Sequence, residues 1–136
     1  MTLRIQDLEN SDVPKVLEIV RTVMPERVEY VLTAIRRSEV LVSRGDAALT
    51  GFVVWNRQFF GKPFCWLLAV APTYRRQGIA SGLLGAVENR CSGERVYVST
   101  NVSNVPMRRL LERCGYVRRG EVDVDQGDPE IFFSKG

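Results

Sequence analysis

Hydrophobic residues follow a helical spacing in the N-terminal third of the chain. Behind the polar pair Ser11-Asp12, either of which can cap a helix, apolar side chains recur at the i, i+3, i+4 and i+7 positions of one helix face: Val13, Val16, Leu17 and Val20. A second stretch, opened by Pro25, repeats this apolar face with Val28, Val31, Leu32 and Ile35. We therefore predict two consecutive helices.

Short apolar runs typical of strands begin near residue 40. Val40–Ser43 and Ala48–Trp55 are separated by the turn-forming pair Gly45-Asp46, which predicts a hairpin. The run Phe64–Val70 is apolar at every position. Such a strand is covered on both faces, so we expect it in the middle of the sheet.

Helix and strand patterns alternate in the C-terminal half. A helix that ends near Ser92-Gly93 has one apolar face, made of Ala80, Leu83, Leu84, Val87 and Cys91. We then expect a strand over Arg95–Thr100, a helix from about Asn104 to Cys114 that Gly115 ends, and strands near Tyr116–Gly120 and Glu130–Phe133 around a polar loop with Asp123, Asp125 and Asp128. The order strand, two helices, three strands, helix, strand, helix, two strands predicts an α/β fold with a mixed sheet.

The amino-acid composition excludes several classes of catalytic and metal site. The 136 residues are 45% hydrophobic and 26% charged, which is ordinary for one globular domain over residues 1–136. The chain has no histidine, so Ser-His and Cys-His catalysis and the usual zinc sites are excluded, and we expect no metal. Three cysteines without a paired spacing, Cys65, Cys91 and Cys114, are interpreted as buried free thiols.

Charge and hydropathy indicate the compartment and partners. A net charge of +3 is too small to predict a nucleic-acid partner. No apolar run approaches the roughly 20 residues that span a bilayer, so we expect no membrane partner and a cytoplasmic location. A homodimer is left open.

The turn Arg75–Ala80 carries the strongest chemical signal. It joins the apolar strand to an amphipathic helix, and the first N–H groups of a helix have no intrahelical acceptor, so they bind anions. Gly78 lets a ligand approach the backbone closely, and the guanidinium groups of Arg75 and Arg76 suit phosphate. We interpret the turn as a phosphate cradle; the alternative is an ordinary turn with solvated arginines.

Two motifs together resemble the GNAT superfamily of acetyl-CoA-dependent N-acyltransferases. Arg75-Arg76-Gln77-Gly78-Ile79-Ala80, behind a strand that ends Leu68-Ala69-Val70-Ala71-Pro72, is similar to the family's motif A. Asn104 opens a helix that closes in Gly115-Tyr116, which looks like its second signature. The resemblance covers about residues 40–117, and its fold is a mixed sheet of about six to seven strands with splayed central strands and four helices packed on both faces.

The resemblance implies where acetyl-CoA binds. Coenzyme A would lie in a wedge between the strand that ends at Val70 and the strand Arg95–Thr100, with its thioester near residues 101–104. The residues so implied are Leu68, Ala69 and Val70 for the pantetheine, Arg75, Arg76, Gln77, Gly78, Ile79, Ala80 and Ser81 for the pyrophosphate, and Asn104, which also suits a helix N-cap.

The usual acid and base of the family are missing. Phe64 and Ser99 stand where members often carry a glutamate base, and Leu111 stands where many carry a proton-donating tyrosine. Positioning alone can supply about 7–11 kcal/mol, against roughly 10²- to 10⁴-fold from acid–base groups, so catalysis survives their loss. Ser99 and Asn101 are left as candidates to order a water that takes the proton. If the reaction needs a dedicated base instead, Asp125, Asp128 and Glu130 near the C-terminus are the first to test.

We therefore expect an N-acetyltransferase that moves an acetyl group from acetyl-CoA directly to a primary amine of a small molecule or peptide. The alternative is an acyl-CoA-binding regulatory module without turnover. A nucleotide phosphate binder is disfavoured, because the Gly-Lys-Ser/Thr of a P-loop is absent.

Overall fold

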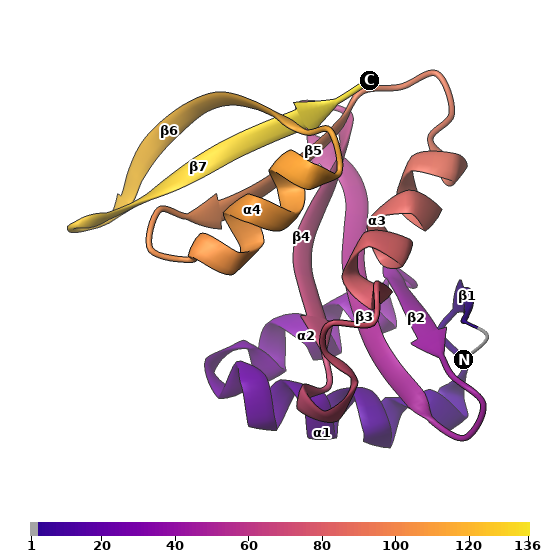
Figure 1. The fold of residues 1–136 in the computed structure, drawn as a ribbon. Coiled ribbons are helices and arrows are strands. Elements are labelled where there is room, and N and C mark those ends of the chain that lie inside the picture. The colour runs from indigo at the N-terminus through magenta and orange to yellow at the C-terminus, as the bar shows by residue number, and fades with distance from the viewer. Residues whose placement is uncertain (1–2) are drawn as a thin grey trace.

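The computed structural model describes residues 3–136, apart from the side chain of Asp125. Within these residues the chain forms seven strands and four α-helices, in the predicted order: β1 (Arg4–Asp7), α1 (Val13–Val23), α2 (Val28–Arg36), β2 (Val40–Arg44), β3 (Leu49–Phe59), β4 (Lys62–Val70), α3 (Ile79–Arg90), β5 (Val96–Asn101), α4 (Val105–Arg113), β6 (Val117–Asp125) and β7 (Asp128–Lys135) (Figure 1). None of the described helices is long and apolar enough to cross a membrane; the cytoplasmic location stays a prediction.

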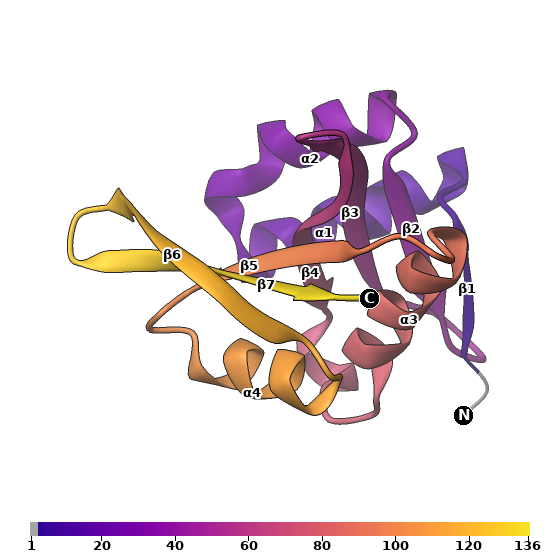
Figure 2. The ribbon, with the colours of Figure 1, turned by 90° about the horizontal axis from the view of Figure 1, so that it is seen from above.

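The strands form one mixed sheet in the order β1-β2-β3-β4-β5-β7-β6. The pair β4–β5 is parallel and the other neighbours are antiparallel. Figure 2 shows α1 and α2 on one face of the sheet and α3 and α4 on the other. The predicted mixed sheet with helices on both faces is confirmed, and the apolar run that begins at Phe64 lies in its middle strand.

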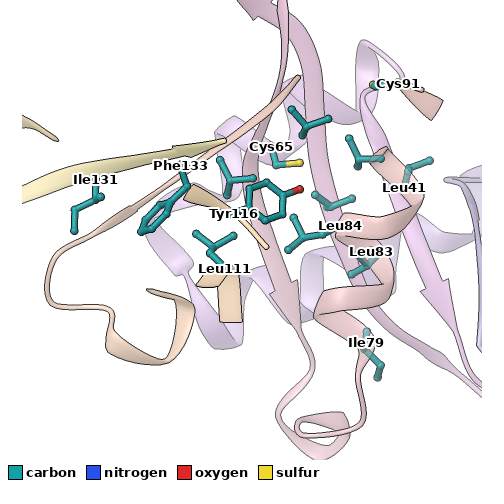
Figure 3. Packing of buried hydrophobic residues seen from close by; sticks show 14 residues of the cluster. Leu41, Cys65, Ile79, Leu83, Leu84, Cys91, Leu111, Tyr116, Ile131 and Phe133 are labelled. Atoms are coloured by element: carbon teal, nitrogen blue, oxygen red, sulfur yellow. The ribbon is translucent and has the colours of Figure 1, made fainter. Parts of the chain in front are cut away.

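A hydrophobic core fills each face. Between α1, α2 and the sheet it contains Val16, Val31 and Phe52. On the opposite face, Leu83 and Leu84 of α3 pack with side chains of α4, β5 and β7, among them Leu111, Ile131 and Phe133 (Figure 3). Burial in this second core raises the pKa of the Cys65 thiol well above its usual range. Cys65 and Cys91 are buried free thiols as predicted, whereas Cys114 is only half-buried.

The middle of the sheet splays because β4 contains a bulge. Val54 of β3 pairs with Leu67, but its neighbour Trp55 pairs with Cys65, so Trp66 has no opposite residue on β3. A bulge bends the strand that carries it. On its other edge β4 pairs with β5 only at Phe64 and Cys65. The remainder of β4 leaves its parallel neighbour and opens a gap, as the family resemblance implied.

Two expectations about local structure are corrected. The stretch with Asp123 and Asp128 is a continuous hairpin of β6 and β7 that turns at Gln126-Gly127, because both strands go on pairing to Asp125 and Asp128. The expectation that β4 is covered on both faces is also wrong. Trp66 is 37% exposed because the strand has left β5 at this point and its face lines an open groove.

Candidate active site

The predicted phosphate cradle lies at the start of α3, where backbone N–H groups have no intrahelical acceptor. Gly78 is the N-cap and has a φ of 77°, a conformation that L residues rarely adopt. The first hydrogen bond of the helix joins the N–H of Gly82 to the carbonyl of Gly78, at 3.0 Å, so the amides of Ile79, Ala80 and Ser81 precede the helical hydrogen bonds. An anion at this terminus would meet several N–H groups and the positive end of the helix dipole.

The two arginines of the cradle and the glutamine that follows them lie at the surface. Arg75, Arg76 and Gln77 are exposed, and Arg76 has a φ of 65°. Arg108, at the start of α4, differs: its guanidinium Nη1 donates to the carbonyl of Val102 at 3.0 Å and so holds the β5–α4 loop. Arg75 and Arg76 are therefore exposed to a ligand, whereas the Arg108 guanidinium is engaged with the backbone of the loop.

One edge of the β4 backbone faces the gap and is free of strand pairing beyond Cys65. Leu68, Ala69 and Val70 pair with β3 along one edge, while β5 has ended its pairing at Cys65 on the other. Strand N–H and C=O groups alternate between the two edges. An extended ligand with amide groups can therefore pair with this free edge of β4.

A groove of about 1020 Å³ runs over the sheet face that carries α2 and reaches this gap. It is lined by residues of α2, β3, β4, β5 and β7 and of the start of α4. Among the lining residues are four that the sequence assigned to cofactor or catalysis: Leu68, Ser99, Asn101 and Asn104. The groove and the gap therefore meet at the ends of β4 and β5.

A carboxylate lies at this meeting point. Ser99 Oγ donates to Glu130 Oε1 at 2.9 Å, and both residues line the groove. Glu130 comes from β7 and lies opposite Asn101 in the β5–β7 register. Because Ile131 and Phe133 point into the core, strand alternation turns Glu130 toward the groove.

The other candidates nearby have structural roles. The Asp128 carboxylate accepts hydrogen bonds from Ser103 N–H at 3.1 Å and from Ser103 Oγ at 2.7 Å, which fixes the loop before α4. Asn104 Oδ1 accepts the N–H of Met107 at 3.3 Å, so its interpretation as a helix N-cap is confirmed. The side chain of Asp125, the third acidic residue of this region, lies outside the described residues. Leu111 is fully buried in the core and offers no proton donor.

Aromatic rings form the floor of the groove beside Glu130. We define the aromatic floor as Phe64, Trp66 and Phe132, which all line the groove. The Phe64 and Trp66 ring centroids are 4.2 Å apart, and those of Phe64 and Phe132 are 6.0 Å apart. Trp66 Nε1 donates to Asn56 Oδ1 at 2.8 Å, which holds the indole in place.

The opposite wall of the groove, from α2, is polar. Its Tyr30 has a raised pKa, chiefly because the phenol is partly buried and secondarily because Glu39 is close, while Arg27 and Arg37 act in the opposite direction. The phenol is protonated at neutral pH even at its ordinary pKa near 10, so Tyr30 can donate a hydrogen bond into the groove. Within the described residues no group of three Cys, Asp or Glu side chains is placed to hold a metal ion.

Known proteins share the sequence pattern and the fold of this chain. The model of the acetyltransferase (GNAT) family matches residues 5–116. S-(2-succino)cysteine N-acetyltransferase of Bacillus subtilis (strain 168) is 29% identical over 119 residues, which are 79% of this chain and 72% of that protein. An acetyltransferase of the GNAT family from Bacillus cereus ATCC 10987 has a TM-score of 0.87 at 29% identity, over 99% of this chain and 97% of that one.

A more distant match shows the fold alone. Naa50 of Arabidopsis thaliana, solved in complex with the bisubstrate analogue CoA-Ac-MVNAL, has a TM-score of 0.80 at 17% identity, over 100% of this chain and 99% of that one. The family match covers most of the chain, so this protein belongs to the GNAT family of acetyltransferases. It is an acyltransferase, and acetyl-CoA is its acyl donor.

Proposed function

We propose that the protein transfers an acetyl group from acetyl-CoA in the β4–β5 gap directly to a primary amine in the groove on the α2 face. The supporting observation is that the groove reaches the gap at Leu68, Ser99 and Asn104, with the Glu130 carboxylate beside Ser99. Donor and acceptor would approach from opposite faces of the splayed sheet. Holding the two together can supply about 7–11 kcal/mol of the barrier.

The cofactor would be held mainly by backbone groups. The amides of Gln77 to Ser81 would bind the pyrophosphate, with Arg75 and Arg76 beside it, and the free edge of Leu68 to Val70 would pair with the pantetheine amides. Asn104 would touch the cofactor from the opposite side of the gap. The free amides at the start of α3 and the free edge of β4 support this proposal for the backbone contacts.

Glu130 would replace the missing base. The amine nitrogen attacks the thioester carbonyl carbon while one of its N–H groups points to the carboxylate. As the C–N bond forms, that proton passes to Glu130; collapse of the tetrahedral intermediate breaks the C–S bond, and the sulfur leaves with the electron pair and takes a proton from solvent. Ser99, which donates to Glu130 Oε1, would hold the carboxylate in position. Such a group typically contributes about 10²- to 10⁴-fold.

The acceptor is the finer part of the proposal. The Bacillus subtilis relative is named for acetylation of S-(2-succino)cysteine, and Naa50 was solved with an analogue that carries a peptide. Both are compatible with an α-amine, which at pKa near 7.8 is roughly a third neutral at about pH 7.5, whereas a lysine amine near 10.4 is about 0.1% neutral. We propose an acceptor with an amine of low pKa.

Release of the coenzyme A thiol tests turnover. The protein is incubated with acetyl-CoA and a panel of amines, and mass spectrometry identifies the product. Amine-dependent thiol release together with an N-acetylated amine supports the enzyme. Cofactor binding by calorimetry without any amine-dependent release would instead support a regulatory acyl-CoA-binding module.

A further inference from the structure

The groove that we propose for the acceptor has a polar end and an aromatic end, and their order along the strands is set by register. Ser99 pairs with Phe132 and Asn101 pairs with Glu130 across β5 and β7. The pair Asn101–Glu130 therefore lies two residues further along the strands than the pair Ser99–Phe132, on the side of the gap. The ring of Phe132 lies on the side away from the gap. On the other side of β5, Phe64 pairs with Tyr97 and extends the aromatic end.

A further ring, that of Phe59, packs against the aromatic floor. Phe59 lies 4.7 Å from Phe64 and 5.7 Å from Phe132 between centroids, and it stacks nearly parallel to the Phe132 ring. Trp66 keeps its exposed face in the groove while Asn56 holds its only donor. Exposed, fixed aromatic faces of this kind bind apolar or aromatic groups with little loss of side-chain entropy.

The groove carries a negative charge, which disfavours binding of an acceptor that has a carboxylate. Its charged lining residues are four glutamates, Glu26, Glu29, Glu39 and Glu130, against two arginines, Arg27 and Arg37, a difference of two negative charges in a protein with a net charge of +3. The carboxylate nearest the gap is Glu130, which would lie beside the reacting amine. A second carboxylate placed next to that amine would be repelled by Glu130.

From this order of polar and aromatic groups we infer that the acceptor is a primary amine joined through a short link to an aromatic or bulky apolar group, with no carboxylate next to the amine. The inference rests on the proposed function of the groove. The amine would contact Glu130, and the apolar group would lie on Trp66 and Phe132, whose rings pack on the buried Phe64. Phenylalaninamide represents this class: it has a low-pKa α-amine, an aromatic ring and no carboxylate.

Matched acceptors test the inference. We compare kcat/KM for phenylalaninamide, for alaninamide, which lacks the ring, for phenylalanine, which adds the carboxylate, and for S-(2-succino)cysteine, which carries several. We expect phenylalaninamide to exceed each of the others by about 10- to 100-fold, the discrimination that burial of one large apolar group supplies. A peptide that begins with Phe, beside one that begins with Ala, distinguishes a peptide source of the same chemistry from a small molecule.

Variants locate the effect in the floor. Trp66→Ala should remove most of the preference for phenylalaninamide over alaninamide and leave the KM for acetyl-CoA unchanged. Phe60→Ala is the control, because Phe60 belongs to the same hairpin and is 89% exposed but does not line the groove. Should Trp66→Ala fail to fold, Trp66→Leu tests the same point.

The outcomes separate the two proposals. Equal turnover of alaninamide and phenylalaninamide, or faster turnover of the carboxylated amines, overturns the inference and leaves the amine acetyltransferase intact. A preference for the ring that survives Trp66→Leu also overturns it. No acetylation of any amine overturns the proposed function itself, and the inference with it.

Discussion

The two sides of the splayed sheet differ in what builds their sites. On the face of α3, the cradle consists of backbone amides and one glycine within a few consecutive residues, 75–81. On the face of α2, the groove consists of side chains from helices and strands far apart in the sequence, and its central contact joins Ser99 to Glu130, which are 31 residues apart. A site built from local backbone groups depends little on side chains, so members of a family can keep the same acyl donor. A site built from side chains of distant elements can be changed by single substitutions, so the acceptor substrate can differ between members.

Loss of the cradle should have the largest effect. Gly78→Val places a β-branched residue at a φ of 77°, which costs at least about 1–2 kcal/mol and distorts the amides that would bind the pyrophosphate. We expect acetyl-CoA to stop raising the melting temperature and acetyl transfer to be lost. Calorimetry and a thermal shift titration measure both.

Gly93→Val is the matched control. Gly93 has a similar φ of 83° and no atom within 4 Å of an added Cβ, but it lies beyond the other end of α3. It should lower stability by a similar amount and keep the response to acetyl-CoA. Equal loss of cofactor binding in both variants would mean that strain, rather than the cradle, explains the result.

Removal of the Glu130 carboxylate should slow acetyl transfer to the acceptor and leave the binding of acetyl-CoA unchanged. We expect Glu130→Gln to lower kcat by about 10²- to 10⁴-fold while the KM for acetyl-CoA stays unchanged. Glu121→Gln is the control, because Glu121 lies on the adjacent strand β6 and is paired with Arg118 at the surface. A Glu130→Gln enzyme with wild-type kcat would remove Glu130 from the mechanism.

The pH dependence should follow the acceptor. Only the neutral amine attacks, so the acid limb of kcat/KM should move up by about two to three pH units when an α-amine of pKa near 7.8 is replaced by an alkyl amine near 10.4. Rates measured from pH 6 to 11 with one amine of each kind give the two midpoints. A midpoint that stays fixed between them would show that an enzyme group limits the rate instead.

The cradle arginines should give the smallest effect. Arg75→Ala and Arg76→Ala should each raise the KM for acetyl-CoA several-fold and change the melting temperature little, since exposed arginines contribute little to folding. Arg113→Ala, an exposed arginine of α4, should leave the KM unchanged. Wild-type affinity in both cradle variants would support the alternative that these arginines are simply solvated.

Local patterns in the sequence predicted the local structure at the proposed cofactor site. The turn with Gly78 and the cap at Asn104 are short motifs, and each needs only its neighbours along the chain to form. The bulge at Trp66 could not be predicted from the sequence. A run of apolar residues has the same pattern whether or not one of them lacks a paired residue on the neighbouring strand. The β4–β5 gap was expected from the family resemblance rather than from the strand pattern.

The acceptor side depends on strand order, which the pattern of apolar residues does not specify. Glu130 stood among three acidic residues near the C-terminus as a base to test, and only the insertion of β7 beside β5 brings it to Ser99. One signal was present in the sequence. Glu130 and Phe132 alternate with the apolar Ile131 and Phe133, so both could have been assigned to the opposite face of the final strand.

A crystal structure with a bisubstrate analogue, coenzyme A joined through an acetyl bridge to phenylalaninamide, tests the central claim most directly. We predict the pyrophosphate on the amides of Gln77 to Ser81, the amine nitrogen within hydrogen-bond distance of Glu130, and the phenyl ring on Trp66 and Phe132. An analogue whose amine half lies on the α3 face, away from Glu130, would contradict the account that donor and acceptor meet through the splayed sheet.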